Sequence, residues 1–210
     1  MNLFYKTVAD TLFFLKKRFS KSRFGKKYTR DEVPLRAELL SSDQMKQHGK
    51  NLASLHQLTK KKATEKLLER LHENEDVLIE TIRRLTAVAK ENSSVAPAEE
   101  WLLDNYYLIE ENVRTSKRHL SRGFRRSLPW LASGPSAGLP RVYDIAQEII
   151  SHGDGRVDLE NLVSFVTAYQ SVSNLKLGEL WAIPIMLRLA LIENLRRIGK
   201  RIMADIADRA

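Results

Sequence analysis

The residues most able to bind a metal are the five histidines of the chain, His48, His56, His72, His119 and His152. No two of them form the H-E-x-x-H pattern that places two imidazoles on one face of a helix. His48 and His56 are two helical turns apart with no acidic residue between them. The spacing therefore predicts no metal site and no cofactor, and it favours surface or interface positions for the histidines.

A turn around Asp154 resembles the middle of an EF-hand, because Asp154 is followed by Gly155. The remaining ligand positions of such a loop do not match. Ile150 and His152 stand where the first and third ligands belong, and Asn161 replaces the bidentate glutamate. We therefore predict a plain helix–turn–helix junction here.

Motifs for covalent or phosphate chemistry are also absent from the sequence. The chain has no cysteine, no G-x-S-x-G, no P-loop, no G-x-G-x-x-G and no D-x-D carboxylate pair for a metal-bound nucleotide sugar. We therefore predict no catalytic residue, and a free-standing enzyme is the least favoured class. The lack of cysteine fits a reducing compartment.

Arginines and tryptophans offer the remaining candidate contacts with ligands. Phosphate could bind Arg141, Arg188, Arg196 and Arg197, but their helices also carry Glu148 and Glu193, so internal ion pairs are favoured. Sugars could stack on Trp101, Trp130 and Trp181. Two of these tryptophans fall within apolar helical stripes, so we predict a core role for them instead.

The net charge of +9 is concentrated near the N-terminus, where residues 1–30 hold nine basic residues and one acid. We interpret 1–30 as a basic amphipathic arm and linker, and 31–210 as a helical domain. One hypothesis places the arm on an anionic membrane surface; the alternative is a disordered or core-packed terminus. The proposed membrane residues are Phe4, Leu12, Leu15, Lys16, Lys17, Arg18 and Phe19.

Apolar residues spaced by three and four, together with capping signals, predict an all-α fold. It would be an irregular bundle of about six to seven helices, with a long packed loop near 121–140 and no strand. The helices are expected at about 2–19, 41–58, 67–89, 97–122, 140–151 and 158–171, with a last helix from 177 almost to the C-terminus that is kinked at Pro184. No segment has the uninterrupted apolar length of a membrane span.

The last of these helices is apolar almost all the way round. Since such a helix must be buried on every side, we predict that it is the centre of the fold, in contact with the helices at 140–151 and 158–171. Trp181 would lie in its core. Part of its surface is also expected to form an interface with another segment, through Trp181, Ile185, Leu189 and Ile192.

Four long strings resemble one bacterial enzyme family. They read LRAELLSSDQMKQHGKNLASLH at 35–56, WLLDNYYLIEENV at 101–113, LPRVYDIAQEIISHGDGRVDLENLVSFVTAYQ at 139–170 and LGELWAIPIMLRLALIENLRRI at 177–198. This pattern, over about 31–205, resembles the N-terminal region of cyclic β-1,2-glucan synthases, which are large inner-membrane glycosyltransferases. The resemblance implies that the glucan is made from UDP-glucose by domains beyond residue 210, so no catalytic residue carries over.

The leading hypothesis is therefore a non-catalytic N-terminal helical segment of such a synthase. It would lie on the cytoplasmic side of the bacterial inner membrane and pack against the remainder of the synthase or the anionic membrane surface, with nucleic acid disfavoured. The alternative is an independent helical adaptor that binds a protein or nucleic acid. The apolar stripe continues through Ile202 and Ile206 to the end of the chain, so we expect a fragment or a truncated product.

Overall fold

The computed structural model describes residues 35, 37–59, 66–90 and 95–209. The basic arm at 1–30, with its seven proposed membrane residues, lies outside this range. The described residues form eight helices and one two-stranded sheet, which confirms the all-α prediction. The elements are α2 (Ser42–Leu55), β1 (Leu58–Thr59), α3 (Lys66–Lys90), α4 (Pro97–Asp104), α5 (Tyr106–His119), α6 (Arg122–Ser127), β2 (Trp130–Leu131), α7 (Arg141–His152), α8 (Leu159–Gln170) and α9 (Leu177–Arg209).

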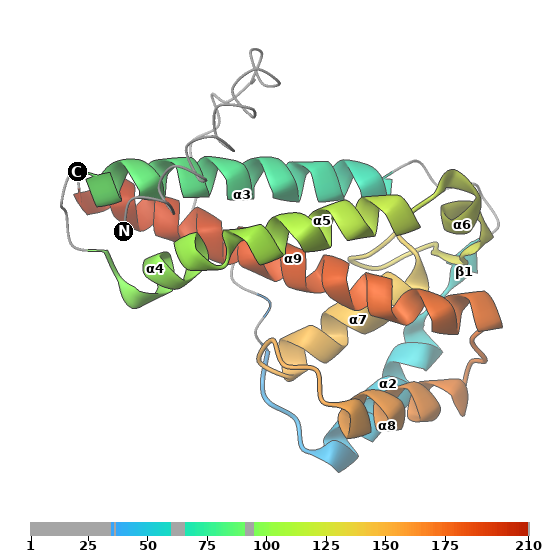
Figure 1. Ribbon diagram of the computed structural model, residues 1–210. Helices are drawn as coiled ribbons and strands as arrows, with labels where there is room; N and C mark the ends of the chain where they lie inside the picture. The colour runs from blue at the N-terminus through green and yellow to red at the C-terminus, as the bar shows by residue number, and fades with distance from the viewer. Residues whose placement is uncertain (1–34, 36, 60–65, 91–94, 210) are drawn as a thin grey trace.

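Helix α9 is the central element of the molecule, as predicted. It packs against α3, α5 and α7, while α2 and α8 lie side by side as a separate pair (Figure 1). The predicted packing of α7 on α9 is confirmed. The main neighbour of α8, in contrast, is α2 rather than α9, because the side of α8 that is buried packs on α2. None of the described helices combines the length and apolar composition that a membrane span needs.

Local sequence signals explain where the helices begin and which faces they bury. Ser41 and Gln44 form the predicted capping box of α2. Asp158 accepts a hydrogen bond from the backbone N–H of Asn161 and caps α8. The helix predicted from Pro97 is divided into α4 and α5 at Asn105, and α6 was not predicted, so the eight described helices outnumber the six to seven expected.

The region 121–140 is packed against the helices, as predicted, but it is not a simple loop. Leu128, Trp130 and Leu131 are buried. The region also contains α6 and strand β2, which pairs antiparallel with β1, Leu58 opposite Leu131. The prediction of no strand was wrong because two-residue strands are too short to produce an alternating pattern.

The prediction that Trp181 lies in the core was wrong, since this residue is 73% exposed. The buried face of α9 includes Ile185, Leu189 and Ile192, which are 7%, 3% and 2% exposed. Trp181 lies on the same side of α9, one helical turn before Ile185 and one turn after Leu177, which is also exposed. The apolar character of α9 therefore did not mean burial along its whole length, because its first turns lie at the edge of the molecule.

Gly49 marks the closest approach of α2 to α8. A Cβ atom at this position would lie 2.9 Å from the carbonyl oxygen of Phe165, a backbone atom that cannot turn aside. We expect Gly49→Ala to lower the free energy of unfolding by about 1–3 kcal/mol, because the helices must separate to admit the methyl group. Urea denaturation followed by circular dichroism measures this change.

The matched control is Gly178→Ala near the start of α9, where a Cβ atom would meet nothing within 4 Å. This variant should be neutral or more stable by up to about 1 kcal/mol, as helix propensity favours alanine. Equal stabilisation of both variants would show that α2 and α8 do not approach as closely as described.

Candidate functional site

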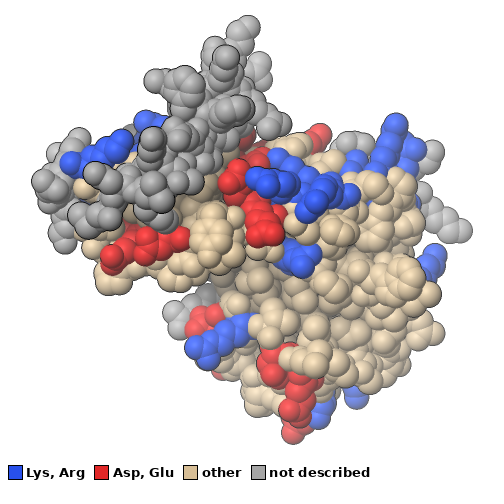
Figure 2. All heavy atoms as spheres, viewed as in Figure 1, with Lys and Arg blue, Asp and Glu red and all other residues tan. Residues whose placement is uncertain are grey.

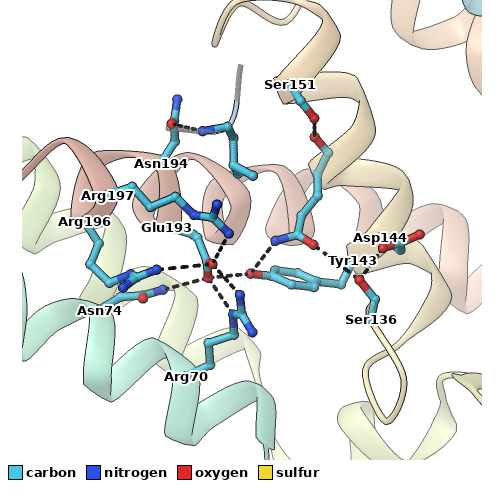
Figure 3. Close-up of polar contacts among 12 residues, drawn as sticks. Arg70, Asn74, Ser136, Tyr143, Asp144, Ser151, Glu193, Asn194, Arg196 and Arg197 are labelled. Atoms are coloured by element: carbon cyan, nitrogen blue, oxygen red, sulfur yellow. Dashed lines mark hydrogen bonds and ion pairs between the residues drawn. The ribbon is translucent and has the colours of Figure 1, made fainter. Parts of the chain in front are cut away.

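A buried ion-pair cluster around Glu193 joins α9 to α3 and α7. The Glu193 carboxylate, at the centre of Figure 3, has no solvent exposure. Arg70 of α3 donates to both of its oxygens, with Nε 2.6 Å from Oε2. The Tyr143 hydroxyl of α7 donates to Oε2 at 3.1 Å. On α9 itself, Arg197 donates to Oε1 at 3.1 Å and Arg196 lies 3.6 Å from it.

These contacts determine the charge state of the cluster. Burial by itself would raise the pKa of the Glu193 carboxyl, but the hydrogen bonds and charge of Arg70, with the charge of Arg196, lower that pKa to about 2. Burial, and next the neighbouring Glu193 charge, raises the pKa of the Tyr143 hydroxyl. At neutral pH Glu193 is therefore ionised while Tyr143 keeps its proton and donates it.

The cluster confirms part of the sequence interpretation and extends it. The predicted internal ion pairs of Arg196 and Arg197 with Glu193 are present. Arg70 and Tyr143 were not predicted, because they come from distant parts of the chain. The side chain of Glu193 has no solvent exposure, so solutes cannot reach its carboxylate. Its bonds to Arg70 and Tyr143 hold three helices together.

Arg141 forms a second buried ion pair, with Glu179 and not with Glu148 on its own helix. Its Nε and one terminal nitrogen donate to the two Glu179 oxygens at 2.6 and 2.8 Å. The guanidinium also donates to the Ser173 hydroxyl and the Asn174 carbonyl. Both charged side chains are at most 3% exposed, so the ion pair is buried. It joins the start of α7 to the start of α9.

The candidate binding surface is a cavity of about 370 Å³ between α4–α5 and the middle of α9, which we call the α5–α9 groove. Its apolar lining comes from Trp101, Leu108 and Ile109 on one side and from Leu191, Ile192 and Leu195 on the other. Trp101 is 52% exposed and Leu108 is 41% exposed, so the prediction of a core role fails for Trp101 too.

Polar groups in the α5–α9 groove are few, and most bond within their own helix. The side-chain amides of Asn105 and Asn112 donate to carbonyls one turn earlier, those of Trp101 and Leu108. Arg188 is the one cationic lining residue, and no described carboxylate pairs with it, contrary to the predicted ion pair. The groove thus offers apolar surface and one half-buried positive charge.

The residues predicted to form an interface are divided between core and surface. Ile192 lines the α5–α9 groove, whereas Ile185 and Leu189 contribute to the core. Trp181 is exposed and lies outside the groove. Their role in an interface stays a prediction.

Three histidines lie in contacts that their spacing along the chain did not reveal. His56 bonds through its two ring nitrogens to the Tyr169 hydroxyl and the Asp144 carboxylate. The other two, His48 and His152, lie against Glu148 and are the candidates for metal binding. The available signal was the four-residue spacing of Glu148 and His152, which puts both on one face of α7.

Comparison with known proteins bears directly on the resemblance. No protein-family model matches the chain. Over 133 residues, or 63% of its length, the chain is 38% identical to the cyclic beta-(1,2)-glucan synthase NdvB of Rhizobium meliloti (strain 1021). The aligned part spans 5% of that relative. The predicted resemblance is therefore confirmed, and the chain is related to a segment of a cyclic β-(1,2)-glucan synthase.

Proposed function

We propose that this chain is the non-catalytic N-terminal helical segment of a cyclic β-(1,2)-glucan synthase, and that it packs against the remainder of the enzyme through the α5–α9 groove. It would do so on the cytoplasmic side of the bacterial inner membrane. The observation that carries the proposal is the groove itself. Exposed Trp101 and Leu108 border a cavity of about 370 Å³, and such apolar surfaces mark interaction sites.

The chemistry of the buried charges supports a non-catalytic role. The most perturbed carboxylate, Glu193, has no solvent exposure and is already bound by Arg70, Tyr143 and Arg197. Arg141 is likewise fully engaged with Glu179. Strong pKa shifts often indicate an active site, but a substrate cannot reach the buried carboxylate of Glu193.

The groove also suggests what its occupant is like. Figure 2 shows that charged side chains are sparse toward the lower right of the face in view. A partner helix with an apolar face would cover Trp101, Leu108 and Leu191. One carboxylate on that helix would pair with Arg188. The remainder of the synthase is the source we propose for this helix, because the chain spans 5% of its relative.

The basic arm supplies a second attachment in this proposal. Its Lys16, Lys17 and Arg18 would contact anionic headgroups, at about 1 kcal/mol per basic residue. Phe4 and Phe19 would insert their rings among the lipids. This contact would hold the segment at the membrane while the groove binds the remainder of the synthase.

Binding in trans tests the proposal. The 210-residue chain is added to detergent-solubilised synthase from the same organism that lacks the corresponding segment, and binding is measured by biolayer interferometry. The wild-type chain should bind. Because Trp101 and Leu108 line the groove and are exposed, the double variant Trp101→Asp/Leu108→Asp should bind at least about tenfold more weakly, the effect of losing about 1.4 kcal/mol.

Val163→Asp is the matched control, since Val163 is 55% exposed on α8 and does not line the groove. It should bind as the wild type does. Arg188→Glu should also weaken binding, by placing two acidic groups together. Absence of wild-type binding, or equal losses in the groove and control variants, would contradict the proposal.

A further inference from the structure

We infer that His48, Glu148 and His152 form a divalent-metal site with the chemistry of zinc. One ligand atom from each residue, two imidazole nitrogens and one carboxylate oxygen, lies within 4.8 Å of the other two. His48 Nε2 is 2.7 Å from Glu148 Oε2, and His152 Nε2 is 3.5 Å from the same oxygen. This His₂Glu set is one that Zn²⁺ binds in proteins.

The spacing of the three atoms suits a metal with only small rotations of the side chains. Zinc–ligand bonds of about 2.0–2.1 Å in a tetrahedron separate neighbouring ligands by about 3.3 Å. The two nitrogen–oxygen separations, 2.7 and 3.5 Å, lie on either side of that value, and the ligand nitrogens of the two histidines lie within 4.8 Å of each other. The three side chains are between 13% and 30% exposed, so an ion could enter from solvent and keep water in its fourth position.

His152 is already oriented in the way that a metal ligand requires. Its Nδ1 lies 2.6 Å from the carbonyl oxygen of Glu38 and donates its hydrogen there. Ligating histidines usually make this bond with the nitrogen that faces away from the metal, because it fixes the tautomer. The Nε2 of His152 then faces Glu148 and His48.

The surroundings of His48 and Glu148 also favour a metal. The ring of His48 packs against the buried ring of Phe165, with centroids 5.9 Å apart, which shields one side from water. No described lysine or arginine pairs with Glu148, so its charge is available to an ion. On binding, the ion replaces the Nε2 proton of His48, which is released to solvent.

A metal at this place would join two parts of the fold. His48 lies on α2, which packs with α8, and the other two ligands lie on α7, which packs with α9. The ion would hold the α2–α8 pair against the central α7–α9 pair. This role is independent of the α5–α9 groove, so failure of either proposal leaves the other standing.

Titration of the full 210-residue chain tests the site. The protein is treated with EDTA, dialysed and titrated with ZnCl₂ by isothermal titration calorimetry, and with CoCl₂ while the visible d–d bands are recorded. We expect one ion per chain and Co²⁺ bands of low-coordinate intensity. His48→Gln, Glu148→Gln and His152→Gln should each weaken binding by at least about tenfold, the lower end of the effect seen for outer-sphere partners.

The matched control is His119→Gln, because His119 is an exposed histidine on α5 that bonds to its own helix through the Thr115 carbonyl. It should bind as the wild type does. Circular dichroism of each variant separates loss of a ligand from loss of the fold, and only variants with the wild-type spectrum are compared. Absence of saturable Zn²⁺ binding, or equal affinity of all variants, would overturn the inference.

Discussion

Replacing Glu193 with glutamine should lower the free energy of unfolding by about 3–5 kcal/mol, since removing one partner from a buried ion pair leaves uncompensated charge. Here Arg70, Arg196 and Arg197 would remain around a neutral amide. The total for a domain is often only about 5–15 kcal/mol, so the variant should be close to unfolding. Urea denaturation gives the value directly.

Glu110→Gln provides the matched control. Glu110 pairs with Arg114 on the surface of α5, with side-chain exposures of 36% and 66%. Exposed pairs of this kind contribute about 0–1 kcal/mol. A loss in Glu193→Gln no larger than the loss in Glu110→Gln would show that the cluster does not hold the three helices together.

The pH dependence of unfolding gives an independent test of the same residue. The folded-state pKa of Glu193, about 2, is below the ordinary value of 4.5, so its contribution is complete above pH 4.5 and is lost as pH falls toward 2. The free energy of unfolding should fall by on the order of 3 kcal/mol over this range of pH. Glu193→Gln should show a shallower decline over this window; an unchanged decline would mean that other carboxylates produce it.

Replacing Arg141 with methionine should lower the free energy of unfolding by about 3–5 kcal/mol, because the Glu179 carboxylate, at 1% exposure, would stay charged without its partner. The Asn174 carbonyl and the Ser173 hydroxyl would lose their donors as well. Thermal and urea unfolding both measure the change. Arg114→Met, at an exposed position, should remain within about 1 kcal/mol of the wild type.

A double variant distinguishes a missing charge from a general packing defect. Arg141→Met/Glu179→Leu removes both charges, and apolar replacement of a whole buried pair is often neutral. It should therefore be more stable than Arg141→Met alone. A double variant that loses the sum of both single effects would show that the two side chains do not act as a pair.

The sequence by itself determined most of the helices and the resemblance to the synthase. The stripe from Leu67 to Leu85 predicted α3, and the Ser41 and Asp158 caps predicted the starts of α2 and α8. These signals act within one or two helical turns, so they can be read from neighbouring residues. The apolar string at 177–198 resembled the kind of enzyme to which the comparison found the chain similar.

The tertiary structure decided which faces meet and which charges pair. Trp181 is exposed because the first turns of α9 lie at an edge, and Gly49 is needed because Phe165 of another helix approaches it. Arg70 reaches Glu193 across 123 positions, and His48 reaches Glu148 across 100. Contacts of this range depend on the packing angles and offsets of helices, which arise from the whole core and leave no periodic signal in the chain.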